Sequence, residues 1–363
     1  MSLLVSSVLA LSSCSTDRTA ATAPPTTTAT TATTTSAAPA PQRVARLGAA
    51  VSAERLASAE PDAELVARHF DSVTPENAMK WSTTRPSATT WNWVGADAIV
   101  EFAERSGLDV RGHTLVWGQP SGNGMPPWLK ETLNPADFTA AVLDGIDTQV
   151  TRYRGRVQRW DVVNEPFEAL SGELQKNVFF ERMGPDYIEQ ALRAARAADP
   201  DAELWINENA TEYLPAKADA LVELVRGLKG RGVPLDGVGL QTHLFLDAPL
   251  PAGAIADLIG GLRELGVDVA LTEVDVPGGS ANRDPTAQQA LWKQVADECV
   301  AAGCVELTTW GVTDASTWLD SPTVRAGIPF LESFTVPTRP LLFDESGQAK
   351  PAFDIIEEAL TRR

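Results

Sequence analysis

Two glutamates stand where a short apolar run comes to its end. Glu165 closes Val157-Gln-Arg-Trp-Asp-Val-Val-Asn-Glu165, and Glu273 lies in Asp268-Val-Ala-Leu-Thr-Glu273-Val-Asp275. In a (β/α)8 barrel, the carboxyl ends of the strands carry the catalytic groups. A pair of carboxylates is the minimum equipment for cleaving a glycosidic bond. The two residues therefore predict glycosidic-bond hydrolysis.

Regularly alternating elements must position these glutamates. From residue 43 onward, short runs of β-formers alternate with longer segments of helical period. The expected strands are 46–51, 72–74, 110–116, 157–164, 202–207, 237–242, 267–272 and 305–310. The expected helices are 63–70, 93–106, 135–153, 185–199, 216–229, 252–265, 286–302 and 351–362. Eight of each over about 320 residues predict an α/β fold, a (β/α)8 TIM barrel. An open doubly wound sheet is the alternative, but no Gly-x-Gly-x-x-Gly follows the first strand.

Polar or aromatic side chains follow seven of the eight expected strands. In chain order they are Glu76 and Asn77, His113 and Trp117, Asn164 and Glu165, Asn207 and Glu208, Gln241 and His243, Glu273 and Asp275, and Trp310 and Trp318. A single polar residue at a strand end is ordinary, because strand ends meet water. Together, on one face of a barrel, these residues predict one polar and aromatic site.

The charge of the chain narrows the class of partner. Thirty Lys and Arg residues against 48 Asp and Glu residues give a formal net charge of −18. Such a chain repels nucleic acid and anionic lipid, so a neutral polysaccharide fits better. No stretch of the sequence is apolar enough to span a bilayer.

The first 42 residues differ in composition from the rest. Residues 1–14 end in Leu11-Ser-Ser-Cys14, similar to a bacterial lipoprotein signal whose cysteine is lipidated. No Lys or Arg precedes the apolar run, so an ordinary leader remains the alternative. Residues 15–42 are almost entirely Thr, Ala, Pro and Ser, which predicts a disordered linker. We expect residues 43–363 to form an extracellular catalytic domain, secreted or tethered to the outer face of a membrane.

Six motifs in order resemble those of glycoside hydrolase family 10, the endo-1,4-β-xylanases. They are Val73-Thr-Pro-Glu-Asn-Ala-Met-Lys80, Gly112-His-Thr-Leu-Val-Trp117, Trp160-Asp-Val-Val-Asn-Glu165, Gln241-Thr-His243, Leu271-Thr-Glu-Val-Asp275 and Trp310-Gly-Val-Thr-Asp314. The ending Pro340-Leu-Leu-Phe-Asp-Glu-Ser-Gly-Gln-Ala-Lys-Pro351 is similar to the closing segment of that family. The resemblance covers the chain from about residue 44 to its end.

The resemblance implies a retaining endo-1,4-β-xylanase that cleaves internal linkages of xylan through a covalent glycosyl-enzyme intermediate. Glu165 would be the acid/base and Glu273 the nucleophile. No cofactor is implied, and we expect a monomer. A β-1,4-glucanase, or a mixed xylanase and cellobiohydrolase on the same barrel, is the alternative. A non-catalytic polysaccharide-binding barrel is the alternative of another class, but such a protein has no need of both glutamates.

The same resemblance implies the supporting residues. Asn164 would bond the 2-hydroxyl of the sugar at the cleavage point. His243 would position Glu273 and be held in turn by Asp275. The full implied set of sugar-binding residues is Glu76, Asn77, Lys80, His113, Trp117, Asn164, Gln241, His243, Trp310 and Trp318.

A metal hydrolase is a rival reading, because His113 and His243 could ligate a cation together with Glu or Asp. No close-set pair of ligands such as His-x-His appears in the sequence. We therefore expect no metal.

Cys299 and Cys304 lie five positions apart. A similar cysteine pair occurs in the family and implies a disulfide in an exported protein, with two free thiols as the alternative.

Three segments depart from the family pattern: Gly118–Met125, Asn207–Ala210, and Thr313, where a basic residue is expected. The departures leave the choice between xylan and glucan open.

Overall fold

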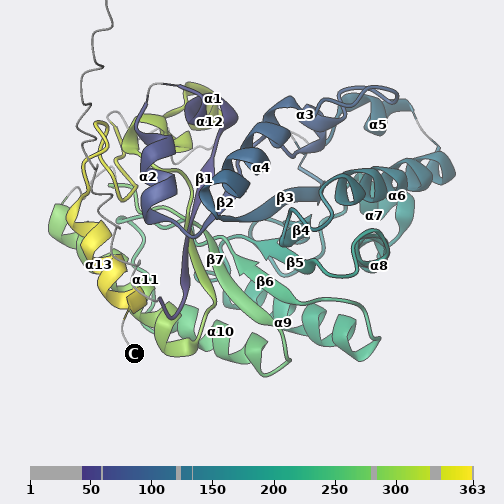
Figure 1. Cartoon of the computed structure of the whole chain (residues 1–363). Coiled ribbons are helices and arrows are strands. Elements are labelled where there is room, and N and C mark those ends of the chain that lie inside the picture. The colour runs from purple at the N-terminus through teal and green to yellow at the C-terminus, as the bar shows by residue number, and fades with distance from the viewer. Residues whose placement is uncertain are drawn as a thin grey trace, which may run out of the picture. The chain divides into compact units, whose positions relative to one another are not determined.

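Eight parallel strands form a closed barrel in the computed structural model (Figure 1). Each strand pairs with the next in chain order, and β8 pairs with β1. The strands are β1 Arg46–Val51, β2 Ser72–Pro75, β3 Asp109–Trp117, β4 Arg159–Asn164, β5 Glu203–Glu208, β6 Gly237–Leu240, β7 Asp268–Val274 and β8 Glu306–Thr309. The predicted TIM barrel is confirmed, and every strand lies where the sequence predicts one.

The structure describes residues 43–58, 60–119, 124–132, 134–278, 284–327 and 337–361. The predicted signal segment 1–14, with Cys14, and the predicted linker 15–42 lie outside these ranges.

Helices lie outside the ring of strands (Figure 1). The eight predicted helices correspond to α2 Asp62–His69, α4 Val94–Ser106, α6 Pro135–Arg152, α8 Tyr187–Ala198, α9 Pro215–Gly230, α10 Ala254–Arg263, α11 Pro285–Ala302 and α13 Pro351–Thr361. Further short helices, which the sequence did not predict, are α1 Ala53–Leu56, α3 Trp81–Thr84, α5 Pro127–Thr132, α7 Val178–Met183, α12 Pro322–Gly327 and the 3-10 turns η1 Asp314–Ser316 and η2 Trp318–Asp320. Each is too short to show a helical period. Within the described residues, no helix has both the length and the apolarity needed to cross a membrane.

Local signals in the sequence set the ends of the long helices. Asn134 caps α6, since its side-chain oxygen accepts from the backbone N–H groups of Ala136 and Asp137 at 3.1 and 3.0 Å. Pro135 occupies the first turn, where its missing N–H costs nothing. Gly303 ends α11 in the left-handed conformation at φ 76°.

Successive side chains along each strand face alternately the layer between strands and helices and the inside of the barrel. In β5, Leu204 and Ile206 belong to the apolar core, which packs the strands against the helices. Trp205 and Asn207, at the alternate positions, are also buried, and they face the inside of the barrel, where Arg111 stacks on the Trp205 ring at 4.6 Å. A side chain at Gly239 of β6 would overlap the Asn207 amide, so glycine leaves the room that this asparagine needs.

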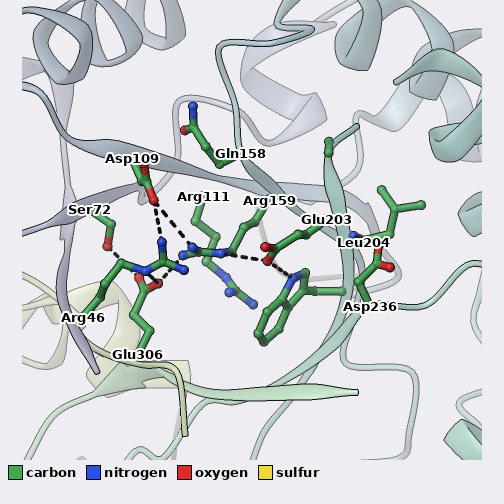
Figure 2. Close-up of polar contacts among 12 residues, drawn as sticks. Arg46, Ser72, Asp109, Arg111, Gln158, Arg159, Glu203, Leu204, Asp236 and Glu306 are labelled. Atoms are coloured by element: carbon green, nitrogen blue, oxygen red, sulfur yellow. Dashed lines mark hydrogen bonds and ion pairs between the residues drawn. The ribbon is translucent and has the colours of Figure 1, made fainter. Parts of the chain in front are cut away.

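The first residues of six of the eight strands form a network of ion pairs and hydrogen bonds at the amino-terminal end of the barrel (Figure 2). We call Arg46, Ser72, Asp109, Arg159, Glu203 and Glu306 the amino-terminal ring. The Arg159 guanidinium contacts Glu306 and Glu203, and Arg46 contacts Asp109 at 2.7 Å. Arg159 and Glu306 are almost fully buried, so each charge depends on the other.

Candidate active site

Glu165 directly follows β4, and two side chains from other strands orient its carboxylate. Trp117, the last residue of β3, donates its indole N–H to Oε2 at 2.8 Å. Gln241, next to the end of β6, donates to Oε1 at 3.0 Å. The backbone N–H of Glu165 donates to the carbonyl of Asn207 at 2.8 Å. Glu165 is in the left-handed region at φ 53°, a conformation that is uncommon outside glycine and recurs at functional sites.

Glu273 in β7 is the more deeply buried of the two glutamates, with 5% of its surface exposed. Asn207 donates to its Oε1 at 2.7 Å, and His243 Nε2 lies 3.2 Å from its Oε2. Burial by itself would raise the pKa of Glu273. The hydrogen bond from His243 and the positive charges of His113, His243 and Lys80 outweigh burial and bring this pKa below its usual range. Glu273 is therefore ionised.

His243 links Glu273 to a second buried carboxylate. His243 Nδ1 lies 3.0 Å from Oδ2 of Asp275, which is fully buried. Burial opposes a charge on the imidazole, but the two carboxylates prevail and raise the pKa of His243 well above its usual value. Trp318, expected as a flat surface for a sugar, also donates its indole N–H to Asp275 at 2.7 Å. Its ring packs against His243 with the centroids 5.1 Å apart.

Three amide side chains, which we call the amide bridge, connect the two glutamates: Asn164, Asn207 and Gln241. Asn164 Oδ1 accepts from Asn207 at 2.9 Å and from Gln241 at 3.3 Å. Asn207 continues to Glu273, and Gln241 continues to Glu165. Both predicted catalytic residues therefore belong to one hydrogen-bonded network. Because Asn164 accepts through its oxygen, its NH2 group points away from these two partners.

Lys80 is one of the positively charged side chains beside the glutamates. It follows β2, is 6% exposed, donates to Asn77 at 3.0 Å and lies over the Trp117 ring at 4.8 Å. Burial lowers the pKa of Lys80, while the negative charges of Glu273, Glu76 and Glu165 partly restore it. Burial likewise raises the pKa of Glu76, against the effect of Lys80. The carboxylates of three strand ends thus act on a single ammonium group.

His113 of β3 is held by a buried ion pair that the sequence did not reveal. His113 Nδ1 lies 2.9 Å from Oδ2 of Asp161, and Arg111 donates to both oxygens of Asp161 at 3.2 and 2.6 Å. Burial opposes ionisation of Asp161, but Arg111 and His113 bring its pKa below its usual range. The His113 ring meets Trp310 edge to face at 5.3 Å.

Asn207 was expected among the strand-end residues, but no catalytic or sugar-binding role was predicted for it. It is the central member of the amide bridge, and Thr272 fixes its orientation by donating to its oxygen at 2.6 Å. Its position at the carboxyl end of β5 was the one available signal. That signal is shared by other strand-end residues, and the partners of Asn207 lie 43 and 66 positions away.

At Thr313, where the resemblance led us to expect a basic residue, a guanidinium group from another element is present. Arg55 of α1 donates to Thr313 Oγ1 at 3.1 Å and to both oxygens of Asp62 at 2.5 and 2.8 Å.

Elsewhere in the fold, a disulfide joins Cys299 and Cys304, whose Cα atoms are 5.1 Å apart. Over the part of the chain that the structure describes, no group of three or more His, Cys, Asp or Glu side chains could hold a metal ion.

Comparisons with known proteins agree with the fold. The chain is 37% identical to endo-1,4-beta-xylanase A of Phanerodontia chrysosporium over 78% of its length and 66% of the relative. It is 34% identical to endo-1,4-beta-xylanase 2 of Claviceps purpurea over 81% of each chain. The crystal structure of xylanase 10B from Thermotoga petrophila in complex with xylobiose matches with a TM-score of 0.78 and 31% identity, over 87% of this chain and 94% of that one. The family model described as glycosyl hydrolase family 10 matches residues 37–359. The chain is therefore a glycoside hydrolase of glycosyl hydrolase family 10.

Proposed function

We propose that this enzyme is a retaining endo-1,4-β-xylanase in which Glu165 is the acid/base and Glu273 the nucleophile. One observation carries the proposal: the amide bridge joins the two carboxylates in a single network while their surroundings differ. Glu273 accepts from an amide and faces a charged imidazole, which suits an ionised nucleophile. The relatives named endo-1,4-beta-xylanase support xylan as the substrate.

In the proposed first step, Glu273 attacks the anomeric carbon while Glu165 gives its proton to the departing glycosidic oxygen. The bond from carbon to the leaving oxygen breaks as the ester to Glu273 forms. In the second step, Glu165 takes a proton from water, and that water displaces Glu273 and releases the sugar with retained configuration. Trp117 and Gln241, which hold both oxygens of Glu165, support this role because the carboxyl group must act at the same place in both steps.

Sugar binding is assigned by the same proposal. The NH2 group of Asn164, directed away from the amide bridge, would donate to the 2-hydroxyl, a bond that strengthens as positive charge develops on the ring. Lys80 and His113 would bind the hydroxyls of the non-reducing part of the substrate. Trp310 and Trp318 would supply apolar ring faces.

We also propose that the enzyme acts outside the cell, tethered through Cys14 and the linker 15–42. The sequence Leu11-Ser-Ser-Cys14 supports this proposal. Growth with an alkyne-labelled fatty acid should label the protein, and Cys14→Ser should abolish the label. Equal labelling of both proteins would contradict the tether.

Product analysis tests the proposed reaction. The purified enzyme is incubated in parallel with xylan and carboxymethyl-cellulose, and the products are followed by chain length and by proton NMR of the anomeric signals. We expect a range of xylo-oligosaccharides whose first-formed anomer is β, and little release from the cellulose derivative. An α anomer would refute the retaining mechanism, and products from the glucan alone would refute the substrate.

A further inference from the structure

A buried ion pair lies next to the segment that carries Glu165. Glu208, the last residue of β5, and Lys217 of α9 are both 0% exposed, and Nζ lies 2.8 Å from Oε1. Lys217 also donates to the Asn209 side chain at 2.8 Å, and the Asn209 N–H donates to Glu208 at 2.8 Å. A buried pair of this kind stabilises a fold little in comparison with apolar side chains, so its presence calls for another explanation.

The carboxylate of Glu208 reaches the backbone immediately beyond Glu165. Its Oε2 accepts from the N–H of Phe167 at 3.1 Å. Pro166 has no N–H, so Phe167 is the first backbone donor after Glu165. The carbonyl of Glu208 accepts from the backbone N–H of Gln241 at 2.9 Å, and the Gln241 side chain orients Glu165. Glu208 thus contacts the strained segment through its carboxylate and the backbone of Gln241 through its carbonyl group.

Glu165 and Glu208 also interact through their charges. Burial and, to a smaller extent, the negative charge of Glu165 raise the pKa of Glu208 to about 7, against the opposing effect of Lys217. A buried charge is screened weakly, so the same interaction acts in return on Glu165. Other charged or titratable groups near Glu165 and Glu208 include Tyr187 of α8, Glu212, which interacts with Lys217, and Lys80, which interacts with Glu165. Glu273 lies across the amide bridge from Glu165.

We propose that Glu208 and Lys217 form a positioning unit for Glu165. The pair fixes the segment from Glu165 to Phe167 and keeps a negative charge near its carboxyl group, which sets the upper limit of the pH range in which Glu165 can donate a proton. This inference rests on the proposed function, because it assumes that Glu165 is the acid.

Glu208→Gln removes the negative charge of Glu208 while keeping the size of the side chain. The amide oxygen of glutamine can still accept from Phe167, but the negative charge is lost and the Lys217 ammonium stays. A nearby positive charge favours the ionised form of a carboxyl group. We expect the alkaline limb of kcat/KM on xylan to move down by about one pH unit. The acidic limb, which reports Glu273, should stay in place.

The double variant Glu208→Gln with Lys217→Met should partly restore the pH of the alkaline limb, which a role in packing alone would not produce. The double variant removes the unpaired ammonium, so the alkaline limb should return part of the way toward the wild-type position. A purely structural role predicts instead that two lost partners are worse than one and that the limb does not move. If Glu208→Gln does not fold, the double variant carries the test, and an alkaline limb at the wild-type pH would overturn the proposal.

Two further variants complete the design. Glu208→Asp keeps the charge on a shorter side chain that does not reach Phe167, so kcat should fall while the alkaline limb stays within about 0.3 of the wild-type pH. Asp314→Asn is the matched control, since Asp314 pairs with Lys350 at 2.9 Å and accepts from Leu341. It should lower stability without moving the limb. A limb displaced equally in both carboxylate-to-amide variants would contradict a specific effect on Glu165.

Glu165→Ala distinguishes failure of this inference from failure of the proposed function. Loss of the acid should slow xylan far more than an aryl xyloside with a good leaving group, which needs little proton donation. Equal loss on both substrates would refute Glu165 as the acid and the inference with it. The expected selective loss, together with an unmoved alkaline limb in Glu208→Gln, would overturn the inference alone.

Discussion

The two ends of the barrel handle charge and backbone in opposite ways. At the amino-terminal ring, Arg159 and Glu306 lie on the first residues of regular strands and neutralise each other. At the carboxyl end, the chain leaves three neighbouring strands through left-handed residues, namely Glu165, Ala210 and Thr242. Thr242 is β-branched, for which a positive φ is especially unfavourable. The strain is concentrated at the end of the barrel that holds the proposed catalytic groups.

This difference teaches how one barrel divides stability and chemistry. A paired buried charge makes a structure intolerant of losing either partner. Strained conformations cost of order 1–3 kcal/mol each and persist where the surroundings enforce them. The amino-terminal ring should therefore determine whether the protein folds, and the carboxyl end should determine whether it reacts.

The largest expected effect is on the rate, at the carboxyl end. Glu273→Ala removes the proposed nucleophile, and we expect kcat on xylan to fall by about 10⁴-fold or more, with the circular dichroism spectrum unchanged. Initial rates with reducing-sugar detection measure the loss. Turnover within about tenfold of the wild type would show that another group attacks the sugar.

The next effect is on stability, at the opposite end. Glu306→Ala leaves the buried Arg159 without its closest partner, so the free energy of unfolding should fall by about 3–5 kcal/mol. The kcat of the folded protein should stay within about twofold of the wild type. Urea unfolding gives the free energy, and Glu306→Gln is the milder companion if the alanine variant is not obtained. A loss below about 1 kcal/mol would show that the ring tolerates an unpaired arginine.

The sequence predicted the elements of this comparison better than their contacts. Strand ends were readable because apolar runs of strand length stop at polar residues, and this located Glu165, His243 and Glu273. Short helices such as α1 were missed, since four residues cannot display a helical period. The contact of Arg55, in that helix, with Thr313 was therefore not predicted.

Pairings across the barrel could not be predicted from residue type. Arg111 and Asp161 lie 50 positions apart, and each alone reads as an ordinary residue of a β-run. Their pairing depends on the register between β3 and β4, which places His113 opposite Asp161 and which no local pattern encodes. Trp318 illustrates the same limit, because its flat ring predicted sugar stacking while its N–H bonds Asp275.

A smaller effect is expected at the carboxyl end of the barrel, on the pH dependence of kcat/KM when His243 is replaced. The charge and hydrogen bond of His243 lower the pKa of Glu273, so His243→Asn should raise that pKa. A nucleophile that ionises later needs a higher pH, and the acidic limb of kcat/KM should therefore move up by about one pH unit. His69→Asn is the control, since His69 packs on Phe353 away from the candidate site. An acidic limb that stays in place, or moves down, would remove His243 from the control of Glu273.

The smallest expected effect tests whether strain at the carboxyl end is general or confined to catalytic residues. Ala210 has φ 54° but makes none of the side-chain contacts of the candidate site. Glycine adopts this conformation without steric cost, so Ala210→Gly should raise the free energy of unfolding by up to about 1 kcal/mol and leave kcat unchanged. The matched control is Ala290→Gly on the exposed face of α11, where the same replacement should cost about 1 kcal/mol because the helical φ suits alanine. If both variants lose stability equally, the left-handed turn after β5 stores no strain, and the unfavourable backbone belongs to the segments flanking Gln241 and Glu165 alone.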